Sequence, residues 1–206
     1  MRTHLGAVGL GLAVAAIALS VGAQEADAAP FSTAERRALV GGELVRRPVT
    51  RVEGPFRFLG GTSYMRVRAP RDRVFAELLD TTAYPRLIPG VAEARLVEDA
   101  GDRRVVYLRH QIAFVSAAYH AVARVDRPAR SIRFDLDRSR PHDVRAGRGF
   151  ITVGAYRGGE SIVTWGVMAD PGSAILGGVF GGVISEWILL VPWCVRGRLE
   201  ADQPGC

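Results

Sequence analysis

The sequence predicts an α+β fold in which consecutive antiparallel strands form one sheet and a long apolar C-terminal segment covers one of its faces. Two observations carry this prediction. Between Val91 and Met168, six segments have the residue pattern of strands and only short turns separate them, which is typical of an antiparallel meander. From Ser173 to about Glu200 the chain is apolar, and Glu186 is its only charge ahead of the last arginines. An antiparallel sheet with one apolar face needs such a cover.

The size and composition fit one globular domain. The chain has 206 residues, of which 48% are hydrophobic and 23% charged, and these proportions exclude wholesale disorder and a polytopic membrane protein. The net charge is +6, and the basic residues are all arginines that alternate with acids along the chain. This spread excludes the basic stripe of a nucleic-acid-binding protein. It leaves open a transient contact with an anionic membrane surface.

The N-terminus is typical of a secretory signal peptide. Arg2 precedes an apolar run from Leu5 to Val21, and small residues allow cleavage after Ala23 or as late as Ala28. We therefore expect a periplasmic or secreted protein, with an uncleaved N-terminal anchor as the alternative. The expected parts are a signal peptide over 1–23, an N-terminal helix and extended arm over 24–58, and the main domain over 59–202.

Two cysteines, Cys194 and Cys206, could pair in an oxidising compartment. The second lies at the end of the C-terminal tail, so the sequence leaves open whether a disulfide forms. No cysteine lies near the cleavage positions, and a lipid-anchored form of export therefore has no acceptor residue there.

The N-terminal helix and arm are predicted from local signals. Ser32 and Glu35 have the spacing of a capping box, so a short helix should run to about Val40. Gly41–Gly42 should end it. The following segment, Glu43–Glu53, contains a proline and suits an edge strand or an extended arm.

The main domain should begin with a strand and a helix. Thr62–Arg68 alternates as a strand does. Asp72 is the predicted N-cap of a helix whose apolar residues, from Val74 to Leu79, recur at helical spacing. The proline-rich stretch 84–90 predicts a short turn-like element. The strands that follow are predicted over Val91–Val97, Arg104–Val115, Ala118–Val125, Ser131–Asp137, Gly149–Ala155 and Ser161–Met168.

Three stretches of the chain resemble a known superfamily. Val67–Phe75 is similar to the first strand and helix entry of START-like (helix-grip) proteins, which include polyketide cyclase/dehydrase and coenzyme Q-binding relatives. Asp80–Val91 is similar to their second helix, and Trp187–Leu199 to the end of their long C-terminal helix. The resemblance covers about Gly60 to Ala201. It implies a curved antiparallel sheet wrapped around a long C-terminal helix, with a cavity for lipids, quinones, sterols or polyketide-like molecules.

The resemblance carries over no catalytic residue, because members of the superfamily differ widely in activity on one scaffold. The chain also contains no nucleophile elbow, P-loop or dinucleotide fingerprint, and its histidines lack the intervals of metal ligands. We therefore expect neither a cofactor nor a metal.

A predicted hairpin supplies the apolar lining of the cavity. We expect Arg104–Val115 and Ala118–Val125 to pair around a turn at Ser116–Ala117. One side of this hairpin is apolar and must face inward. Its members are Val106, Leu108, His110, Ile112 and Phe114 on the first strand and Tyr119, Ala121, Ala123 and Val125 on the second. The alanines either let the long helix approach or leave volume for a ligand.

His110 is the polar exception on this inward side. It is either a core histidine bonded to backbone or to a neighbouring hydroxyl, or a polar group that orients a ligand. Apolar residues of neighbouring elements are expected around the same cavity. The predicted ligand-binding residues are His110, Ile112, Phe114, Tyr119, Phe134, Leu136, Phe150, Trp165, Phe180 and Ile184.

The apolar C-terminal segment admits more than one interpretation. Glycines at 177, 178, 181 and 182 each disfavour a helix by about 1 kcal/mol. They either allow close packing on the sheet or open the mouth of the cavity. Ala174–Val195 is also long enough for a membrane-spanning tail anchor. Glu186 and Pro192 argue against an anchor and favour a buried helix.

A polar loop, Asp137–Asp143, is a second candidate site. His142 and Asp143 are adjacent, so on a strand they would point to opposite faces rather than form a catalytic pair. A salt-bridged turn is the main interpretation. The alternatives are a cavity-mouth or partner-contact role for Arg140 and His142, and catalysis.

Three hypotheses for function follow from these patterns. The first is an exported carrier that shields an apolar molecule, with affinity from buried area and orientation from His110 and Tyr119. The second is a protein-interaction module whose core is filled by its own side chains. The third is a cyclase or dehydratase in which His110 is a general base next to a second acid.

Overall fold

The computed structural model of the protein describes residues 30–112, 115–172, 186–200 and 206. The predicted signal peptide and its cleavage positions lie outside these residues. The helices are α1 (Thr33–Gly41), α2 (Arg71–Leu79), α3 (Tyr84–Leu87) and α6 (Val191–Leu199), with 3₁₀ turns η1 (Thr81–Ala83) and η2 (Arg157–Gly159). The strands are β1 (Val45–Glu53), β2 (Phe56–Val67), β3 (Val91–Asp99), β4 (Arg103–Ile112), β5 (Val115–Asp126), β6 (Ser131–Leu136), β7 (Ala146–Ala155) and β8 (Ser161–Asp170).

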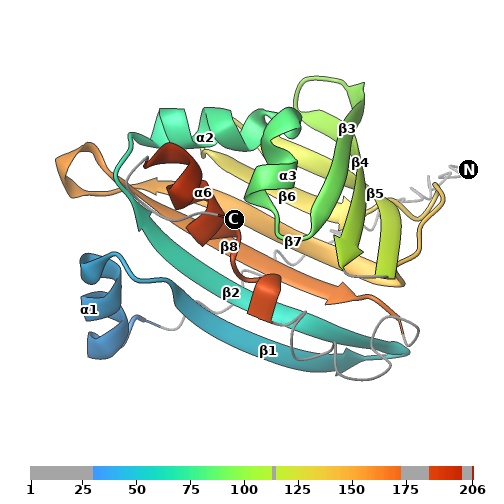
Figure 1. Ribbon diagram of the computed structural model, residues 1–206, viewed down its shortest axis with the longest axis horizontal. Helices are drawn as coiled ribbons and strands as arrows, with labels where there is room; N and C mark the ends of the chain where they lie inside the picture. Colours follow the sequence, from blue (N-terminus) through green and yellow to red (C-terminus); the bar gives the residue numbers. More distant parts are fainter. Residues whose placement is uncertain (1–29, 113–114, 173–185, 201–205) are drawn as a thin grey trace, which may run out of the picture. The chain divides into compact units, whose positions relative to one another are not determined.

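Residues from Phe31 onward form one compact unit built on a single sheet. Its eight strands are antiparallel and follow the order β1-β2-β8-β7-β6-β5-β4-β3. Helices α2, α3 and α6 lie over one face of the curved sheet, here called the inner face (Figure 1). The opposite face is called the outer face. The predicted α+β architecture, an antiparallel meander with a C-terminal helix, is confirmed.

The main core fills the space between the inner face and these three helices. Strand residues such as Val67, Val163 and Ile151 pack there against Val74 of α2 and Val195 of α6. Each of these side chains is almost completely buried. Burial of this apolar surface is the main driving force for the fold.

The N-terminal helix has the predicted capping box. The Glu35 amide donates to the Ser32 hydroxyl at 3.2 Å, and the Ser32 amide donates to the Glu35 carboxylate at 2.8 Å. Gly42 ends the helix in the left-handed region, with φ at 77°. The following segment is the edge strand β1 rather than a free arm, because it pairs with β2 over its whole length.

The predicted N-cap of α2 is wrong. Pro70 occupies the N-cap position in an extended conformation, and no side chain caps the helix. Asp72 lies inside the first turn, where a negative charge is favourable, and its carboxylate pairs with Arg130 at 2.7 Å.

The predicted turn of the β4–β5 hairpin is also wrong, although the predicted faces are right. Ser116 and Ala117 pair with Gln111 and His110, so residues 116–117 belong to strand β5 and not to the turn. Even positions of β4 still pair with odd positions of β5, as the partners Leu108 and Tyr119 show. Because side chains alternate along a strand, an even slip in register leaves the inward set unchanged.

The C-terminal helix is shorter than expected in the part that is described. Glu186–Trp187 form a helical turn, the helix is interrupted at 188–190, and α6 begins at Val191. The proline at 192 explains the new start, because a proline fits the first turn of a helix and disrupts its interior. The four glycines and most of the considered membrane span fall at 173–185, outside the described residues.

Two further observations concern this end of the chain. Cys194 and Cys206 form a disulfide bridge, with their Cα atoms 5.0 Å apart, which settles the pairing that the sequence left open. None of the helices within the described ranges has the length and apolar character to cross a membrane.

Candidate ligand cavity

A cavity of about 240 Å³ lies between the inner face and the helical cover. The strands β4 to β8 and Leu59, near the start of β2, supply its walls. Leu87, Ile88 and Pro89 of the α3 region and Val191 of α6 supply its cover. The walls are almost entirely apolar, with side chains such as Val106, Leu108, Ile132, Leu136 and Val167.

Two stacked aromatic rings form one flat wall of the cavity. The centroids of Phe134 and Trp165 lie 5.0 Å apart, with their planes 23° from parallel. The Trp165 indole N–H donates to the Ile188 carbonyl at 2.7 Å, so its polar atom is satisfied. Gly149 makes room for this wall, because a Cβ there would lie 2.4 Å from the Phe134 ring.

Small side chains of β5 leave the volume open. Ala117, Ala121 and Ala123 all line the cavity. Ala121 pairs with Val106 on one side and Leu136 on the other. A larger side chain at these positions would occupy the space directly.

The cavity contains one pair of polar side chains that face each other across neighbouring strands. His110 of β4 and Tyr119 of β5 both line the cavity, and His110 Nε2 lies 2.9 Å from the Tyr119 hydroxyl. Their rings are nearly parallel, with centroids 5.6 Å apart. Both side chains are half-buried by surface area.

The surroundings keep both members of this pair uncharged. Burial lowers the pKa of His110 to about 4, and a hydrogen bond with the Pro89 backbone opposes part of that shift. Burial raises the pKa of the Tyr119 hydroxyl. Near neutral pH the pair is therefore an imidazole and a phenol, each able to make hydrogen bonds without a net charge.

The other polar residues along the cavity are engaged elsewhere. The Tyr84 hydroxyl donates to the Leu78 carbonyl at 3.1 Å. Asp135 and Arg148 adjoin the cavity through β6 and β7, but their charged ends bond Arg124 and Glu53 at 3.0 and 2.8 Å. Within the described lining, His110 and Tyr119 are the polar groups that remain for a ligand.

The structure brings together part of the predicted ligand-binding set. His110, Tyr119, Phe134, Leu136 and Trp165 all line the cavity. Phe114, Phe180, Ile184 and the side chain of Ile112 lie outside the described residues. Leu87 of α3 and the following residue, Ile88, were not predicted. The only sequence signal for them is that they are the apolar residues of a proline-rich stretch.

Phe150 is the predicted residue that the structure places elsewhere. In the β7–β8 pairing Ile151 lies opposite Trp165, whereas Phe150 lies opposite Gly166. Since neighbours across strands share a face, Phe150 is on the outer face. Its ring covers Gly166, where a Cβ would lie 2.3 Å from the ring.

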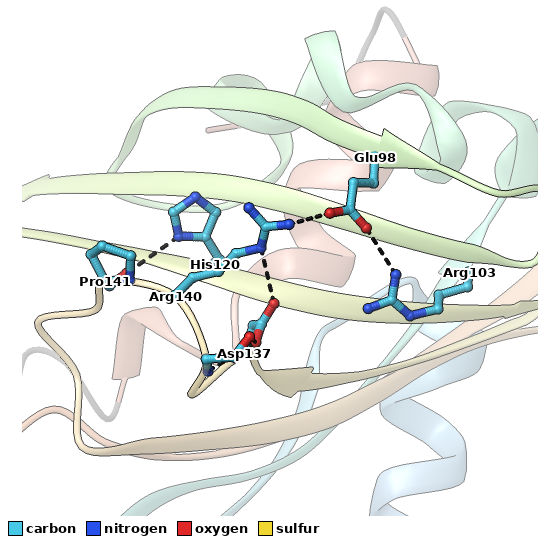
Figure 2. A network of polar contacts seen from close by, with 7 residues as sticks. Glu98, Arg103, His120, Asp137, Arg140 and Pro141 are labelled. Atoms are coloured by element: carbon cyan, nitrogen blue, oxygen red, sulfur yellow. Dashed lines mark hydrogen bonds and ion pairs between the residues drawn. The ribbon is translucent and has the colours of Figure 1, made fainter.

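Arg140 and His142 do not adjoin the cavity either. Figure 2 shows Arg140 between Asp137 and Glu98, with Glu98 also bound to Arg103. The Arg140–Asp137 contact is 3.2 Å, and His142 Nδ1 lies 2.7 Å from the Val144 carbonyl. This arrangement on the outer face is the salt-bridged turn that the sequence favoured. A partner contact there stays a prediction.

No metal centre is formed in the described part of the chain, where no three His, Cys, Asp or Glu side chains cluster suitably. The described lining of the cavity offers shape, apolar surface and one neutral hydrogen-bonding pair. These are the properties of a site for an uncharged organic molecule.

Comparison with known proteins places this geometry in context. The profile of a family described as polyketide cyclase / dehydrase and lipid transport matches residues 61–190. A comparison with curated protein sequences finds no match. Among solved structures, TTHA0849 from Thermus thermophilus is similar, with a TM-score of 0.56 and 14% identity over 69% of this chain and 98% of the other.

Two further solved structures share the architecture. A fragment of the STAR-related lipid transfer protein from Xanthomonas axonopodis has a TM-score of 0.54 and 18% identity, over 83% of this chain and 96% of the other. A START superfamily protein from Mycobacterium smegmatis has a TM-score of 0.53 and 16% identity, over 68% of this chain and 96% of the other. At such identities the likeness shows the fold alone.

Proposed function

Because the chain belongs to the polyketide cyclase / dehydrase and lipid transport family and has the START-like helix-grip fold, we propose that it is an exported carrier for an apolar small molecule. The ligand would be a lipid, quinone, sterol or polyketide-like molecule held in the cavity. Its affinity would come from buried apolar area, and His110 and Tyr119 would orient it.

The cavity is the observation that carries this proposal. A protein-interaction module with a filled core would need no void of about 240 Å³ under its helices. The volume is slightly below the range of about 300–1,000 Å³ for sites of drug-sized ligands. The occupant would therefore be a small ring system, or the ring end of a longer molecule.

A cyclase or dehydratase is the second candidate, because the cavity does hold a pair of titratable groups. The electrostatics favour binding over proton transfer. A general base is most effective when its pKa lies near the working pH, whereas burial lowers the pKa of His110 to about 4. The raised pKa of Tyr119 makes it a weaker acid in turn.

Export is supported by two independent features. The N-terminal 28 residues have the basic start, apolar run and small residues of a signal peptide. Cys194 and Cys206 form a disulfide, and disulfides persist in oxidising compartments. Fractionation of host cells tests this part, since a protein retained in the cytoplasm with residues 1–23 intact would contradict it.

The central experiment is native mass spectrometry, followed by organic extraction, on mature protein purified from the exported fraction without detergent. We expect one apolar molecule per chain, and its mass would give its class. An empty protein that also fails to bind the neutral fluorescent probe Nile red would contradict the carrier proposal. That result would favour the interaction module.

A further inference from the structure

A groove separate from the ligand cavity lies between α6 and the start of β1. Trp193 and Arg196 of α6 line it from one side, and Gly42 and Arg46 line it from the other. Among the described residues, the groove and the cavity have no lining residue in common. The groove is therefore a second site with its own chemistry.

Arg196 is a cation whose hydrogen-bonding groups are only partly satisfied. Its Nη1 donates to the Gly42 carbonyl at 2.5 Å, whereas its Nε is buried and has no hydrogen-bond partner. No carboxylate in the described part of the chain forms an ion pair with this guanidinium. Buried donors without a partner are rare in native proteins, and a bound ion is one of the few explanations for them.

Arg46 brings a second cation to the same groove. It lies opposite Ser63 in the β1–β2 pairing, and Ser63 lies opposite Trp165 in the β2–β8 pairing. Neighbours across strands share a face, so Arg46 is on the inner face, which α6 covers. The next residue, Arg47, bonds Glu35 at 2.8 Å on the other side of the strand. Arg46 itself pairs with no acid within the described ranges.

The charge of the groove is positive even with its one acidic residue counted. Glu43 is the acid of the described lining, and its side chain is exposed. Its Oε1 lies near Gly41, 3.6 Å from the position that a Cβ would take there, and it pairs with neither Arg46 nor Arg196. Two guanidinium groups thus face one carboxylate, which leaves an excess positive charge for an anion to compensate.

We propose that this groove binds a phosphate group, supplied either by a soluble phosphate or by a phospholipid headgroup. Guanidinium groups from two different elements offer N–H donors in different directions, and the oxygens of a tetrahedral phosphate can accept from both. Trp193 adds an aromatic surface next to the arginines, which an organic group attached to the phosphate can contact. The proposal does not depend on the carrier function, since the two sites are separate.

The tryptophans allow a titration of the mature protein to show where phosphate binds. Of the three tryptophans in the chain, Trp193 lines the groove, whereas Trp165 and Trp187 line the cavity. Inorganic phosphate is added at pH 7 and constant ionic strength, and the indole N–H signals are followed by NMR. We expect the Trp193 signal to shift with a Kd below about 10 mM, while the other two stay in place.

Co-sedimentation with vesicles tests the second source of the phosphate group. The vesicles consist of phosphatidylcholine, with or without phosphatidic acid. If the groove takes a lipid headgroup, we expect binding to the vesicles that contain phosphatidic acid and little binding to phosphatidylcholine alone. This binding should weaken as salt is added, because exposed charges are screened.

Three substitutions identify the groove as the site. Arg46→Gln removes an exposed cation without an ion pair in the described chain, so the fold should be retained and phosphate should bind about three- to tenfold more weakly. Glu43→Gln removes the opposing charge and should tighten binding about two- to threefold. The matched control is Arg133→Gln, which changes an exposed arginine of β6 and should bind as the wild type does.

Each outcome decides for or against the proposal. A Trp193 shift with inorganic phosphate that Arg46→Gln weakens supports it with a soluble phosphate. Binding only to vesicles with phosphatidic acid, reduced by Arg46→Gln more than by Arg133→Gln, supports it with a lipid headgroup. The proposal is overturned if neither probe binds, or if Arg46→Gln and Arg133→Gln have equal effects.

Discussion

Two tyrosine–histidine pairs of the same β4–β5 hairpin show what the two faces of the sheet do to identical residue types. On the inner face, His110 and Tyr119 are hydrogen-bonded at 2.9 Å beside an apolar cavity. On the outer face, Tyr107 and His120 have tilted rings 5.3 Å apart, and the His120 ring bonds the Pro141 carbonyl at 3.2 Å. The two pairs have the same residue types, and what distinguishes the inner pair is that it lines the cavity.

The same contrast extends over the rest of the sheet. Outer-face arginines pair with acids or lie over rings, as Arg124 does with Asp135 and Arg148 does with Phe58, 4.7 Å from the ring centroid. Exposed ion pairs and cation–π contacts of this kind contribute at most about 1 kcal/mol each. Inner-face residues are close-packed, so a change there should have a larger effect.

A substitution that displaces the backbone of β2 should have the largest effect on stability, because the packing on both faces of the sheet depends on the position of this strand. Gly60 has φ at 152°, and a Cβ there would lie 1.9 Å from the Val167 carbonyl oxygen. We expect Gly60→Ala to lower the free energy of unfolding by about 3 kcal/mol or more. Chemical denaturation measures this.

Gly147→Ala is the matched control for that substitution, since no heavy atom lies within 4 Å of its added Cβ. We expect a change below about 0.5 kcal/mol there. Equal effects of the two substitutions would show that the β2 backbone has no special constraint.

His110 should give the protein a pH-dependent stability. The folded-state pKa of His110 is about 4 and its ordinary value is 6.5, so between these values the unfolded chain binds more protons. Stability from this group is complete above about pH 6.5 and is lost as the pH falls toward 4. The full loss is about 3 kcal/mol by linkage.

Unfolding by urea between pH 7.5 and 5 measures this slope. His110→Gln should flatten the curve, because glutamine does not titrate in this range. His142→Gln changes an exposed histidine and should keep the slope. A wild-type slope that survives in His110→Gln would assign the pH dependence to other groups.

Filling the cavity should separate binding from folding. Ala121→Leu places a larger side chain between Val106 and Leu136 in the cavity wall. We expect naphthalene or Nile red to bind at least about tenfold more weakly, a loss of about 1.4 kcal/mol, with the fold retained. Ala118→Leu, on the outer face opposite Arg109, should bind as the wild type does. Equal binding by both variants would mean that the probes occupy another site.

Strand alternation explains how much of this site was readable from the sequence. The inward set of the β4–β5 hairpin was right even though its turn was placed at 116–117, because the register slip was even. The segment contains no glycine, asparagine or aspartate to mark a two-residue turn. The hydrogen bond between His110 and Tyr119 depends on the true register, so no pattern in the sequence could place it.

The residues that the sequence analysis misplaced or missed have other causes. Phe150 is apolar and was predicted to line the cavity. Its ring instead lies on the outer face, where it covers Gly166 of the neighbouring strand β8, a residue without a side chain to block it. Leu87 and Ile88 were missed as cavity residues because their contacts come from the packing of α3 on the sheet, which is a tertiary effect. Hydrophobicity alone does not tell which face of a two-sided strand is buried.

The outer-face ion pairs should give the smallest effect. Arg140 is half-buried and bonds Asp137 and Glu98 across the outer face (Figure 2). We expect Arg140→Ala to lower the free energy of unfolding by less than about 1 kcal/mol, since such pairs are largely screened by solvent. Naphthalene binding should stay unchanged, because Arg140 does not adjoin the cavity. A binding loss of tenfold or more would place Arg140 at the cavity mouth, and the outer face would then contribute to recognition as well.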